Sequence, residues 1–174
     1  GYLPLRRFAK SEIVPSNKDR FLRKETLLGF VHDEASAFFG GLAGNAGLFS
    51  TARDVARVYQ MLLNGGEIDG QRYLSKETCQ LFTTETSKIS RRGLGFDKPD
   101  ADDSKKGNCA PAAPAEVYGH TGFTGTCAWV DPVNELVYVF LSNRIYPDVT
   151  NRKLNQLHIR ERIQGAIYDA MKKK

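Results

Sequence analysis

The chain has 174 residues, of which 41% are hydrophobic and 26% are charged, and its formal net charge at neutral pH is +5. A disordered chain would have fewer apolar residues and a larger net charge, and a folded chain of this length buries roughly 70% of the surface that its unfolded form exposes. The composition therefore predicts a packed globular protein, and we expect one domain over residues 1–174.

The positive charge is concentrated at the two ends of the chain. Residues 1–24 and residues 150–174 each contain seven basic and two acidic residues, whereas the residues between them carry a net negative charge. A nucleic-acid-binding domain more often has a basic stripe with interleaved aromatic residues across its folded body. The charge pattern therefore argues against nucleic acid as a partner.

The cysteine and histidine residues do not form a recognisable ligand pattern. Cys79, Cys109 and Cys127 have no CxxC spacing, and their odd number argues against a disulfide framework. The three histidines are scattered along the chain, so we expect no metal site and no cofactor. No run approaches the ~20 consecutive apolar residues that a membrane-spanning helix needs, so we expect no membrane span in this chain.

The first part of the chain contains few regular patterns. Residues 1–28 are basic and irregular, and we expect loop with a short helix near residues 19–28. Residues 31–39 suit a short helix with acidic residues in its first turn, where they favour the helix dipole. Residues 40–47 then contain four glycines, which indicates positive φ angles or close backbone approach.

The most strongly periodic stretch follows. Apolar residues recur at helical spacing over residues 51–63, Thr51 and Asp54 have capping-box spacing, and Gly65-Gly66 follows the run. We expect a second, shorter helix over residues 75–82. Residues 29–96 thus make up the helical part of the predicted domain.

The pattern changes from helix to strand near residue 117. Residues 97–116 are polar and rich in Pro, Ala, Asp and Lys, which predicts a long loop. Three runs rich in β-forming residues then predict strands at 117–119, 125–130 and 136–142. The turn-forming residues 131–135 make the last two strands an antiparallel hairpin.

Apolar residues at helical spacing between Leu154 and Met171 predict a carboxyl-terminal helix. Residues 117–174 therefore supply the sheet and the last helix. The order of helices, strands and closing helix predicts an α+β fold, with an antiparallel sheet of about three to four strands flanked by helices.

Three segments together resemble the superfamily of serine β-lactamases, DD-peptidases and family VIII esterases. Residues 44–56 are similar to the GGLxSTxxDxAR helix entry of that superfamily, Gly119-His120-Thr121-Gly122 is similar to its K/H-T-G strand box, and residues 129–144 are similar to the hairpin after the box. A lone His-Thr-Gly is a weak signal, but the order and spacing of the three segments make the combination strong. The resemblance covers residues 30–170 and implies a β-lactamase/transpeptidase-like fold.

The resemblance implies roles for four residues of one wall of an acyl-transfer site. The Phe123 N–H is an expected oxyanion donor, the Thr121 hydroxyl is expected to contact a substrate carboxylate or carbonyl, and Gly122 allows close approach of the substrate. His120 stands where many relatives have lysine. Because neutral imidazole both donates and accepts whereas ammonium only donates, His120 favours an esterase-like or peptidase-like parent over penicillin-type carboxylate recognition.

Two candidate site residues, His120 and Asn143, also have a structural explanation. Outside this motif His120 would be taken as a strand histidine that makes only structural hydrogen bonds, but its position within the box favours the site. Asn143, at the end of the predicted hairpin, is a candidate for contact with a ligand, although the end of a strand explains it as well.

The nucleophile motif of the superfamily, Ser-x-x-Lys, does not occur in these 174 residues, and neither does its Ser-x-Asn or Tyr-x-Asn motif. Both motifs normally precede the segments that match. We therefore expect the chain to be the carboxyl-terminal portion of a larger serine hydrolase domain and to be inactive alone. In the parent, an ester, amide or peptidoglycan-type bond would be hydrolysed through an acyl-enzyme. The alternative is a non-catalytic, lactamase-like module that binds a peptide or a glycan.

The resemblance also implies a substrate class and a cellular location for the parent protein. Its substrate would be a small molecule or peptidoglycan-like, and its location extracytoplasmic (periplasmic), whereas the residues themselves indicate no compartment. Without the strands that complete the sheet in this superfamily, the strand after Gly119 is expected to leave an exposed sheet edge. Such an edge predicts self-association or reduced stability.

Overall fold

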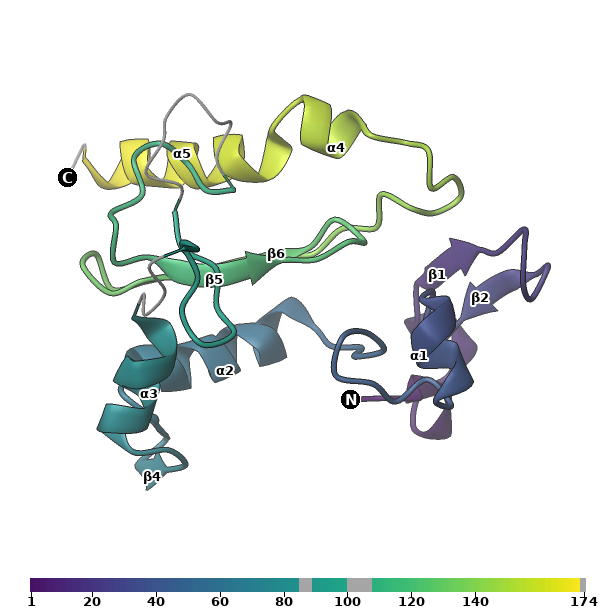
Figure 1. The fold of residues 1–174 in the computed structure, drawn as a ribbon, viewed down its shortest axis with the longest axis horizontal. Coiled ribbons are helices and arrows are strands. Elements are labelled where there is room, and N and C mark those ends of the chain that lie inside the picture. Colours follow the sequence, from purple (N-terminus) through teal and green to yellow (C-terminus); the bar gives the residue numbers. More distant parts are fainter. Residues whose placement is uncertain (85–88, 100–107, 173–174) are drawn as a thin grey trace. The chain divides into compact units, whose positions relative to one another are not determined.

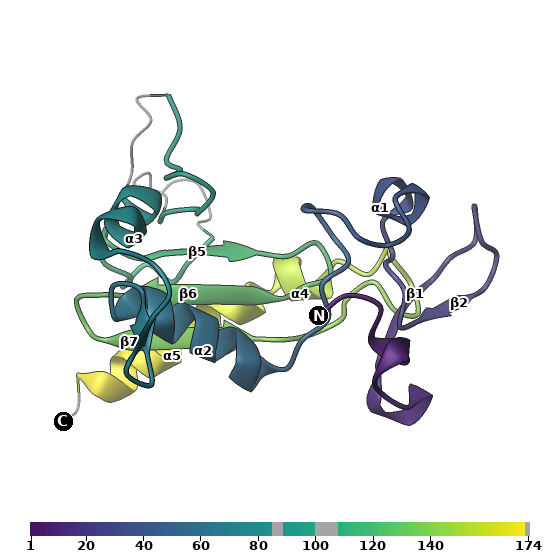
Figure 2. The ribbon, with the colours of Figure 1, turned by 90° about the horizontal axis from the view of Figure 1, so that it is seen from below.

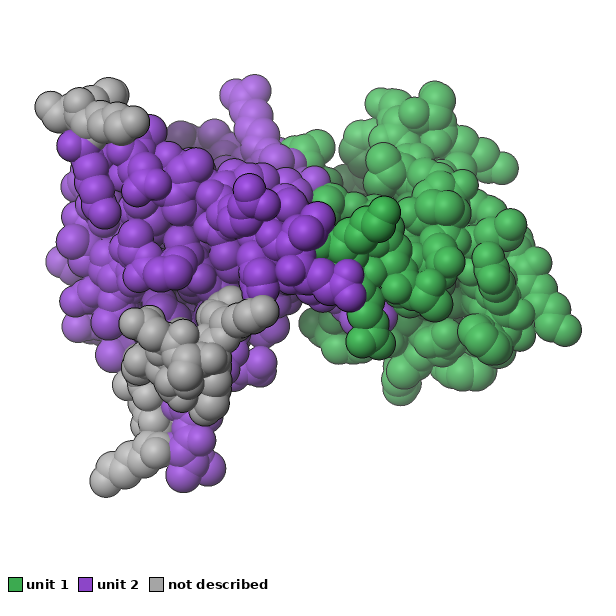
Figure 3. Space-filling view, turned by 90° about the horizontal axis from the view of Figure 1, so that it is seen from above, with its two compact units in different colours: residues 1–51, 142–153 green, residues 52–141, 154–174 purple. Residues whose placement is uncertain are grey.

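The structure is a computed structural model, and it describes residues 1–84, 89–99 and 108–172. The chain divides into two compact units (Figure 3). Unit 1 consists of Gly1–Thr51 and Ser142–Lys153, and unit 2 consists of Ala52–Leu141 and Leu154–Lys174. The single domain expected over residues 1–174 stays a prediction.

Unit 1 is built from short elements. Two 3-10 turns, a two-stranded antiparallel hairpin and one helix follow one another: η1 (Pro4–Arg6), η2 (Lys10–Glu12), β1 (Pro15–Lys18), β2 (Thr26–Leu28) and α1 (Glu34–Phe38). Asp33 caps α1, because its carboxylate accepts a hydrogen bond from the Ser36 backbone N–H at 2.7 Å. The helix predicted within residues 31–39 is thus confirmed.

The short helix expected near residues 19–28 does not form, and that prediction was wrong. Asp19 instead organises the connection between β1 and β2. Its buried carboxylate accepts hydrogen bonds from the backbone N–H groups of Phe21, Leu22 and Arg23 and from the Arg23 guanidinium. A carboxylate that bonds to nearby N–H groups in this way offers the backbone an alternative to a helix.

Unit 2 begins with α2 (Ala52–Leu63), which confirms the strongest helix prediction. The helix ends before Gly65 and Gly66, which both have positive φ, and a Cβ atom on Gly66 would lie 2.2 Å from the Leu74 carbonyl oxygen. A small hairpin and a second helix follow: β3 (Glu67–Ile68), β4 (Gln71–Arg72) and α3 (Lys76–Thr83). Ser75 caps α3 by accepting from the Thr78 N–H at 3.1 Å, in agreement with the predicted start of this helix.

A three-stranded antiparallel sheet forms the centre of unit 2. Its strands lie in the order β5 (Tyr118–Thr121), β6 (Cys127–Asp131) and β7 (Leu136–Phe140). β6 and β7 form the predicted hairpin, and the Asp131 carboxylate closes their turn by accepting from the backbone N–H groups of Val133 and Asn134. The α+β class and the strand number agree with the prediction.

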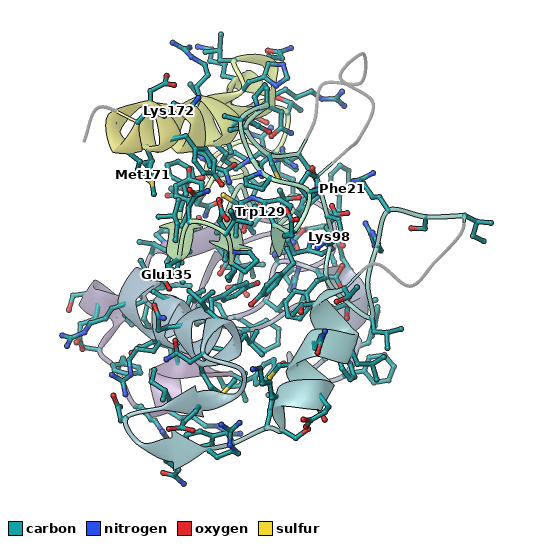
Figure 4. All side chains as sticks on the ribbon, turned by 90° about the vertical axis from the view of Figure 1, so that its left-hand side faces the viewer. Phe21, Lys98, Trp129, Glu135, Met171 and Lys172 are labelled. Atoms are coloured by element: carbon teal, nitrogen blue, oxygen red, sulfur yellow. The ribbon has the colours of Figure 1, made fainter. Side chains whose placement is uncertain are left out.

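The central strand β6 is covered on both faces. In two views α2 lies on one face of the sheet and α5 (Ile159–Met171) on the other (Figures 1 and 2). Because side chains alternate along a strand, Cys127 and Trp129 point towards α5, and Ala128 and Val130 point towards α2. Trp129 is 1% exposed and is the largest side chain of the core on the α5 side (Figure 4).

Hydrogen bonds at several points along α5 attach it to the rest of unit 2. Gln164 accepts from the Ala110 N–H at 2.9 Å, Tyr138 donates its hydroxyl to the Arg160 carbonyl oxygen at 3.0 Å, and Tyr168 donates its hydroxyl to the Asp131 carboxylate at 2.7 Å. The last bond is buried at both ends. The side chains that hold α5 therefore lie along most of its length.

The predicted carboxyl-terminal helix is interrupted. A short helix, α4 (Lys153–Gln156), precedes α5, and between them His158 adopts a left-handed conformation with φ of 49°. Within the parts of the chain that the structure describes, no helix has the length and apolar character needed to cross a membrane.

Replacement of Tyr168 by phenylalanine is expected to lower the free energy of unfolding by about 1–3 kcal/mol, because the buried Asp131 carboxylate loses one of its hydrogen-bond donors. Chemical denaturation followed by circular dichroism measures this change. Tyr73→Phe is the matched control, since its hydroxyl is on the surface of unit 2. Equal effects of the two substitutions would show that the Tyr168–Asp131 bond does not anchor α5.

Candidate functional site

The box Gly119-His120-Thr121-Gly122 lies at the end of β5. On the side of β5 away from β6, which we call its outer edge, Asp97 pairs with Gly119. The Asp97 N–H donates to the Gly119 carbonyl oxygen at 2.7 Å, and the Gly119 N–H donates back to the Asp97 carbonyl oxygen at 3.1 Å. The backbone groups of Gly119 therefore point outwards.

The direction of the Gly119 backbone groups determines the direction of the backbone N–H and C=O groups of His120 and Thr121. In an antiparallel strand, residues two apart direct their N–H and C=O groups to the same side, so those of Thr121 also point to the outer edge and those of His120 point to β6. Among residues 1–84, 89–99 and 108–172, the backbone pairing on this edge ends at Gly119. Thr121 thus lies where an extended chain can pair with β5.

The His120 side chain is bonded within the box. Its Nδ1 lies 2.6 Å from the Thr121 carbonyl oxygen. Because a carbonyl oxygen only accepts, Nδ1 carries the hydrogen, and in the neutral imidazole Nε2 keeps its lone pair. His120 lies opposite Ala128 in the ladder, so its ring is on the α2 face, whereas Thr121, opposite Cys127, has its hydroxyl on the α5 face.

The box turn, residues 122–126, connects β5 to β6. The Gly122 N–H donates to the Thr126 carbonyl oxygen at 2.8 Å, and the Gly125 N–H donates to the Gly122 carbonyl oxygen at 2.9 Å. Gly125 has φ of 108°, a conformation that glycine adopts without strain. Phe123 lies at the tip of this turn, and its side chain is 59% exposed.

The backbone of β6 leaves no room for a side chain at Gly119, and Gly122 lies close to the Thr126 hydroxyl. A Cβ atom on Gly122 would lie 2.3 Å from the Thr126 hydroxyl oxygen, and one on Gly119 would lie 2.1 Å from the Ala128 carbonyl oxygen and 2.7 Å from the Trp129 ring. The role of Gly122 in substrate approach stays a prediction.

A buried polar network supports the outer edge at Asp97. This residue is 3% exposed, and its carboxylate accepts from the Arg91 guanidinium, with Nε at 3.0 Å, and from the Asn108 amide at 2.6 Å. Sequence reasoning assigned no role to Asp97, which it placed in a long loop, and no local pattern marks it as the partner of Gly119.

An aromatic cluster supports the α2 face of β5. The Phe96 ring lies edge-on to Tyr59 of α2 and to Tyr118 of β5, with centroid distances of 6.2 and 5.4 Å. Lys98 is buried beside Tyr118 and donates its ammonium hydrogens to the carbonyl oxygens of Thr83 and Glu116. These contacts give the strand that carries the box a rigid support on this face.

Asn143 belongs to unit 1, where its side chain makes structural hydrogen bonds. Its amide nitrogen donates to the carbonyl oxygens of Pro15 and Ser16 at 2.6 and 3.0 Å, and its amide oxygen accepts from the Ile145 N–H at 3.1 Å. These bonds use both donor hydrogens of the amide. Contact of Asn143 with a ligand stays a prediction.

The described part of the chain contains neither an activated thiol nor a cluster of metal-ligating side chains. Burial raises the pKa of the Cys79 and Cys109 thiols, and it raises the pKa of Cys127 to about 11, so all three are protonated at neutral pH and are poor nucleophiles. Residues 1–84, 89–99 and 108–172 contain no group of three or more His, Cys, Asp or Glu side chains arranged to hold a metal ion.

Comparison with known proteins gives consistent matches. The model of the family described as Beta-lactamase matches residues 7–161. An Escherichia coli (strain K12) protein named "Putative D-alanyl-D-alanine carboxypeptidase" is 34% identical over 161 residues, which are 89% of this chain and 37% of the relative. Proteins of the same name from Salmonella agona (strain SL483) and Salmonella typhi are each 38% identical over 135 residues, 77% of this chain and 31% of theirs. The chain thus spans about a third of the length of these curated relatives.

Replacement of Gly119 by alanine is expected to lower the free energy of unfolding by about 1–3 kcal/mol, because the new methyl group overlaps the Ala128 carbonyl oxygen and the Trp129 ring. The matched control is Gly165→Ala in α5, where the nearest atom to the new Cβ lies at 3.9 Å. This control is expected to stabilise by up to about 1 kcal/mol, since alanine is the better helix former. Urea denaturation of both variants measures the difference, and a neutral Gly119→Ala would contradict the close packing of β5 on β6.

Proposed function

Because the chain belongs to the Beta-lactamase family of serine hydrolases, we propose that residues 120–123 form one wall of an acyl-transfer site. In this proposal the complete protein hydrolyses an amide or ester bond through an acyl-enzyme. The observation that carries the proposal is the outer edge of β5, where the pairing with Asp97 ends at Gly119 and the backbone groups of Thr121 point outwards.

In this proposal, residues 120–123 bind the substrate and stabilise the negative charge that develops during acyl transfer. An extended substrate pairs with the outward N–H and C=O of Thr121, as peptides do when they add to the edge of a sheet. The Thr121 hydroxyl bonds to a carboxylate or carbonyl of the substrate, and the Phe123 N–H donates to the oxyanion that develops during acyl transfer. His120 holds the strand end through Nδ1 and offers Nε2 to the substrate.

The proposed substrate class is a peptidoglycan-type peptide that ends in D-alanyl-D-alanine. The names of the curated relatives support this choice, and the outer edge of β5 suits an extended peptide. We place the nucleophile outside these 174 residues, since none of the serines in this chain is followed by lysine three residues later.

The 174-residue chain is expected to bind an acetylated peptide ending in D-alanyl-D-alanine without turning it over. Nuclear magnetic resonance should show shifts of the backbone signals of Thr121, Gly122 and Phe123. Thr121→Ala is expected to weaken binding up to about tenfold through loss of one hydrogen bond. Thr150→Ala, an exposed threonine of unit 1, is expected to have no effect. Turnover of nitrocefin, a p-nitrophenyl ester or the peptide by this chain would contradict the proposal, and so would shifts confined to residues outside the box.

The second candidate is a non-catalytic module that uses the same edge to bind a peptide or a glycan. It is favoured by one observation, the lack of a Ser-x-x-Lys motif in these residues. The sequence encoded before Gly1 discriminates between the two. A Ser-x-x-Lys motif there would support the hydrolase, and a complete upstream sequence without one would support the module.

We also propose that the chain self-associates through β7, the other end strand of the sheet. The backbone N–H and C=O groups of Gly119 and Thr121 point away from β6. Their ladder partners in β6, Trp129 and Cys127, therefore direct their own backbone groups towards β7. There they bond to Tyr138 and Phe140. It follows that the N–H and C=O groups of residues 137 and 139 point to the free side. The strand Leu136–Phe140 contains no charge and no proline, the features that normally protect an edge from pairing.

Val139→Pro is expected to reduce self-association, because proline removes an outward N–H and leaves the bonds to β6 intact. Sedimentation velocity over a range of concentrations measures the effect. The wild-type chain should form dimers, with two β7 strands antiparallel, while the variant stays monomeric. A compact and highly stable wild-type monomer would contradict pairing through β7.

A further inference from the structure

Arg160 connects the start of α5 to the box turn, and the roles above do not use it. Its Nη1 donates to the Thr126 carbonyl oxygen at 3.3 Å, and its Nη2 donates to the Asn155 side-chain oxygen of α4 at 3.2 Å. The Thr126 carbonyl oxygen also accepts the Gly122 N–H at 2.8 Å, so one oxygen receives donors from both the turn and the helix. The guanidinium therefore reaches the hydrogen bond that closes the box turn.

A second hydrogen bond of Gly122 bears on the direction of the Phe123 N–H. This N–H belongs to the same peptide group as the Gly122 carbonyl oxygen, which accepts the Gly125 N–H at 2.9 Å. Because a peptide group is planar, fixing the Gly122 carbonyl fixes the direction of the Phe123 N–H as well. The turn is thus held by two hydrogen bonds of Gly122, and Arg160 contacts the oxygen that accepts the one at its base.

We propose that Arg160 is a positioning residue that clamps the box turn through the Thr126 carbonyl oxygen and so holds the Phe123 N–H in the direction that an oxyanion donor needs. A charged donor makes a stronger hydrogen bond than a neutral one, so the guanidinium limits the movement of the oxygen that accepts the Gly122 N–H. The importance of Phe123 for catalysis rests on the proposed function, whereas the clamp itself is a property of the turn.

The fork of the guanidinium suits this task better than an ammonium group does. Arginine has separate Nη atoms that reach Thr126 and Asn155 at the same time, so the side chain is held at both ends of its planar group. Lysine carries one nitrogen on a flexible stem and cannot reproduce this geometry. Arg160→Lys is therefore expected to retain the charge and to restore the clamp only in part.

Backbone hydrogen exchange of the 174-residue chain, followed by nuclear magnetic resonance, tests the clamp. Arg160→Gln is expected to speed exchange of the Gly122 N–H about tenfold, the loss of roughly one hydrogen bond to a charged group. Arg160→Lys should fall between this variant and the wild type. Arg162→Gln is the matched control, since Arg162 is an exposed residue of the same helix and should leave the exchange at Gly122 unchanged.

Tyr138→Phe separates positioning from general stabilisation. It removes the other hydrogen bond between the sheet and the start of α5, the one to the Arg160 carbonyl oxygen, without touching the turn. A purely structural Arg160 would make the two variants alike, with faster exchange across β6 and β7 and no selective effect at Gly122. That pattern, or an unchanged Gly122 in Arg160→Gln, would overturn the proposal. Failure of peptide binding to the wild type would instead count against the proposed function and leave the exchange result standing.

Discussion

The burial of β6 on both faces is the constraint on which the rest of unit 2 depends. All five residues of Cys127–Asp131 are buried, so the strand requires a helix on each side and a strand on each edge. α2 and the aromatic cluster cover one face, and α5 with the Trp129 core covers the other. The position of β6 therefore determines where β5 and β7 lie. The hydrogen bonds to β6 also determine which backbone N–H and C=O groups of β5 and β7 point away from the sheet.

The two end strands, β5 and β7, differ in what lies beside their outer edges. The outer edge of β5 is partly occupied by Asp97, whose buried carboxylate is fixed by Arg91 and Asn108, so that only its last residues are open. The outer edge of β7 has no such neighbour among the residues that the structure describes. An end strand without charge or proline, such as β7, is an edge that pairs readily with another strand.

The sequence predicted the elements whose signal is local and periodic. α2, α3 and the β6–β7 hairpin have helical or alternating patterns with clear start and stop residues, and the structure confirms them. The connection after β1 was mistaken for a helix because its conformation depends on one carboxylate, Asp19, which bonds to the N–H groups that a helix would use. The break at His158 is equally invisible in a pattern whose apolar residues continue across it.

The candidate site was predicted in part. The box residues were identified by resemblance, and their position at a strand end agrees with it, but their supports lie far away in the sequence. Asp97 is 22 residues before Gly119 and Arg160 is 34 residues after Thr126, the latter separation being bridged by a single side chain. Contacts of this kind depend on tertiary packing, which neither spacing nor composition reveals.

The bond between His120 Nδ1 and the Thr121 carbonyl oxygen has a consequence for what the ring can offer to a ligand. With the hydrogen on Nδ1, the neutral imidazole has its lone pair on Nε2, so this atom accepts a hydrogen bond. A lysine in the same place would offer donors only. The end of β5 therefore suits a ligand that presents an N–H or O–H group to the ring.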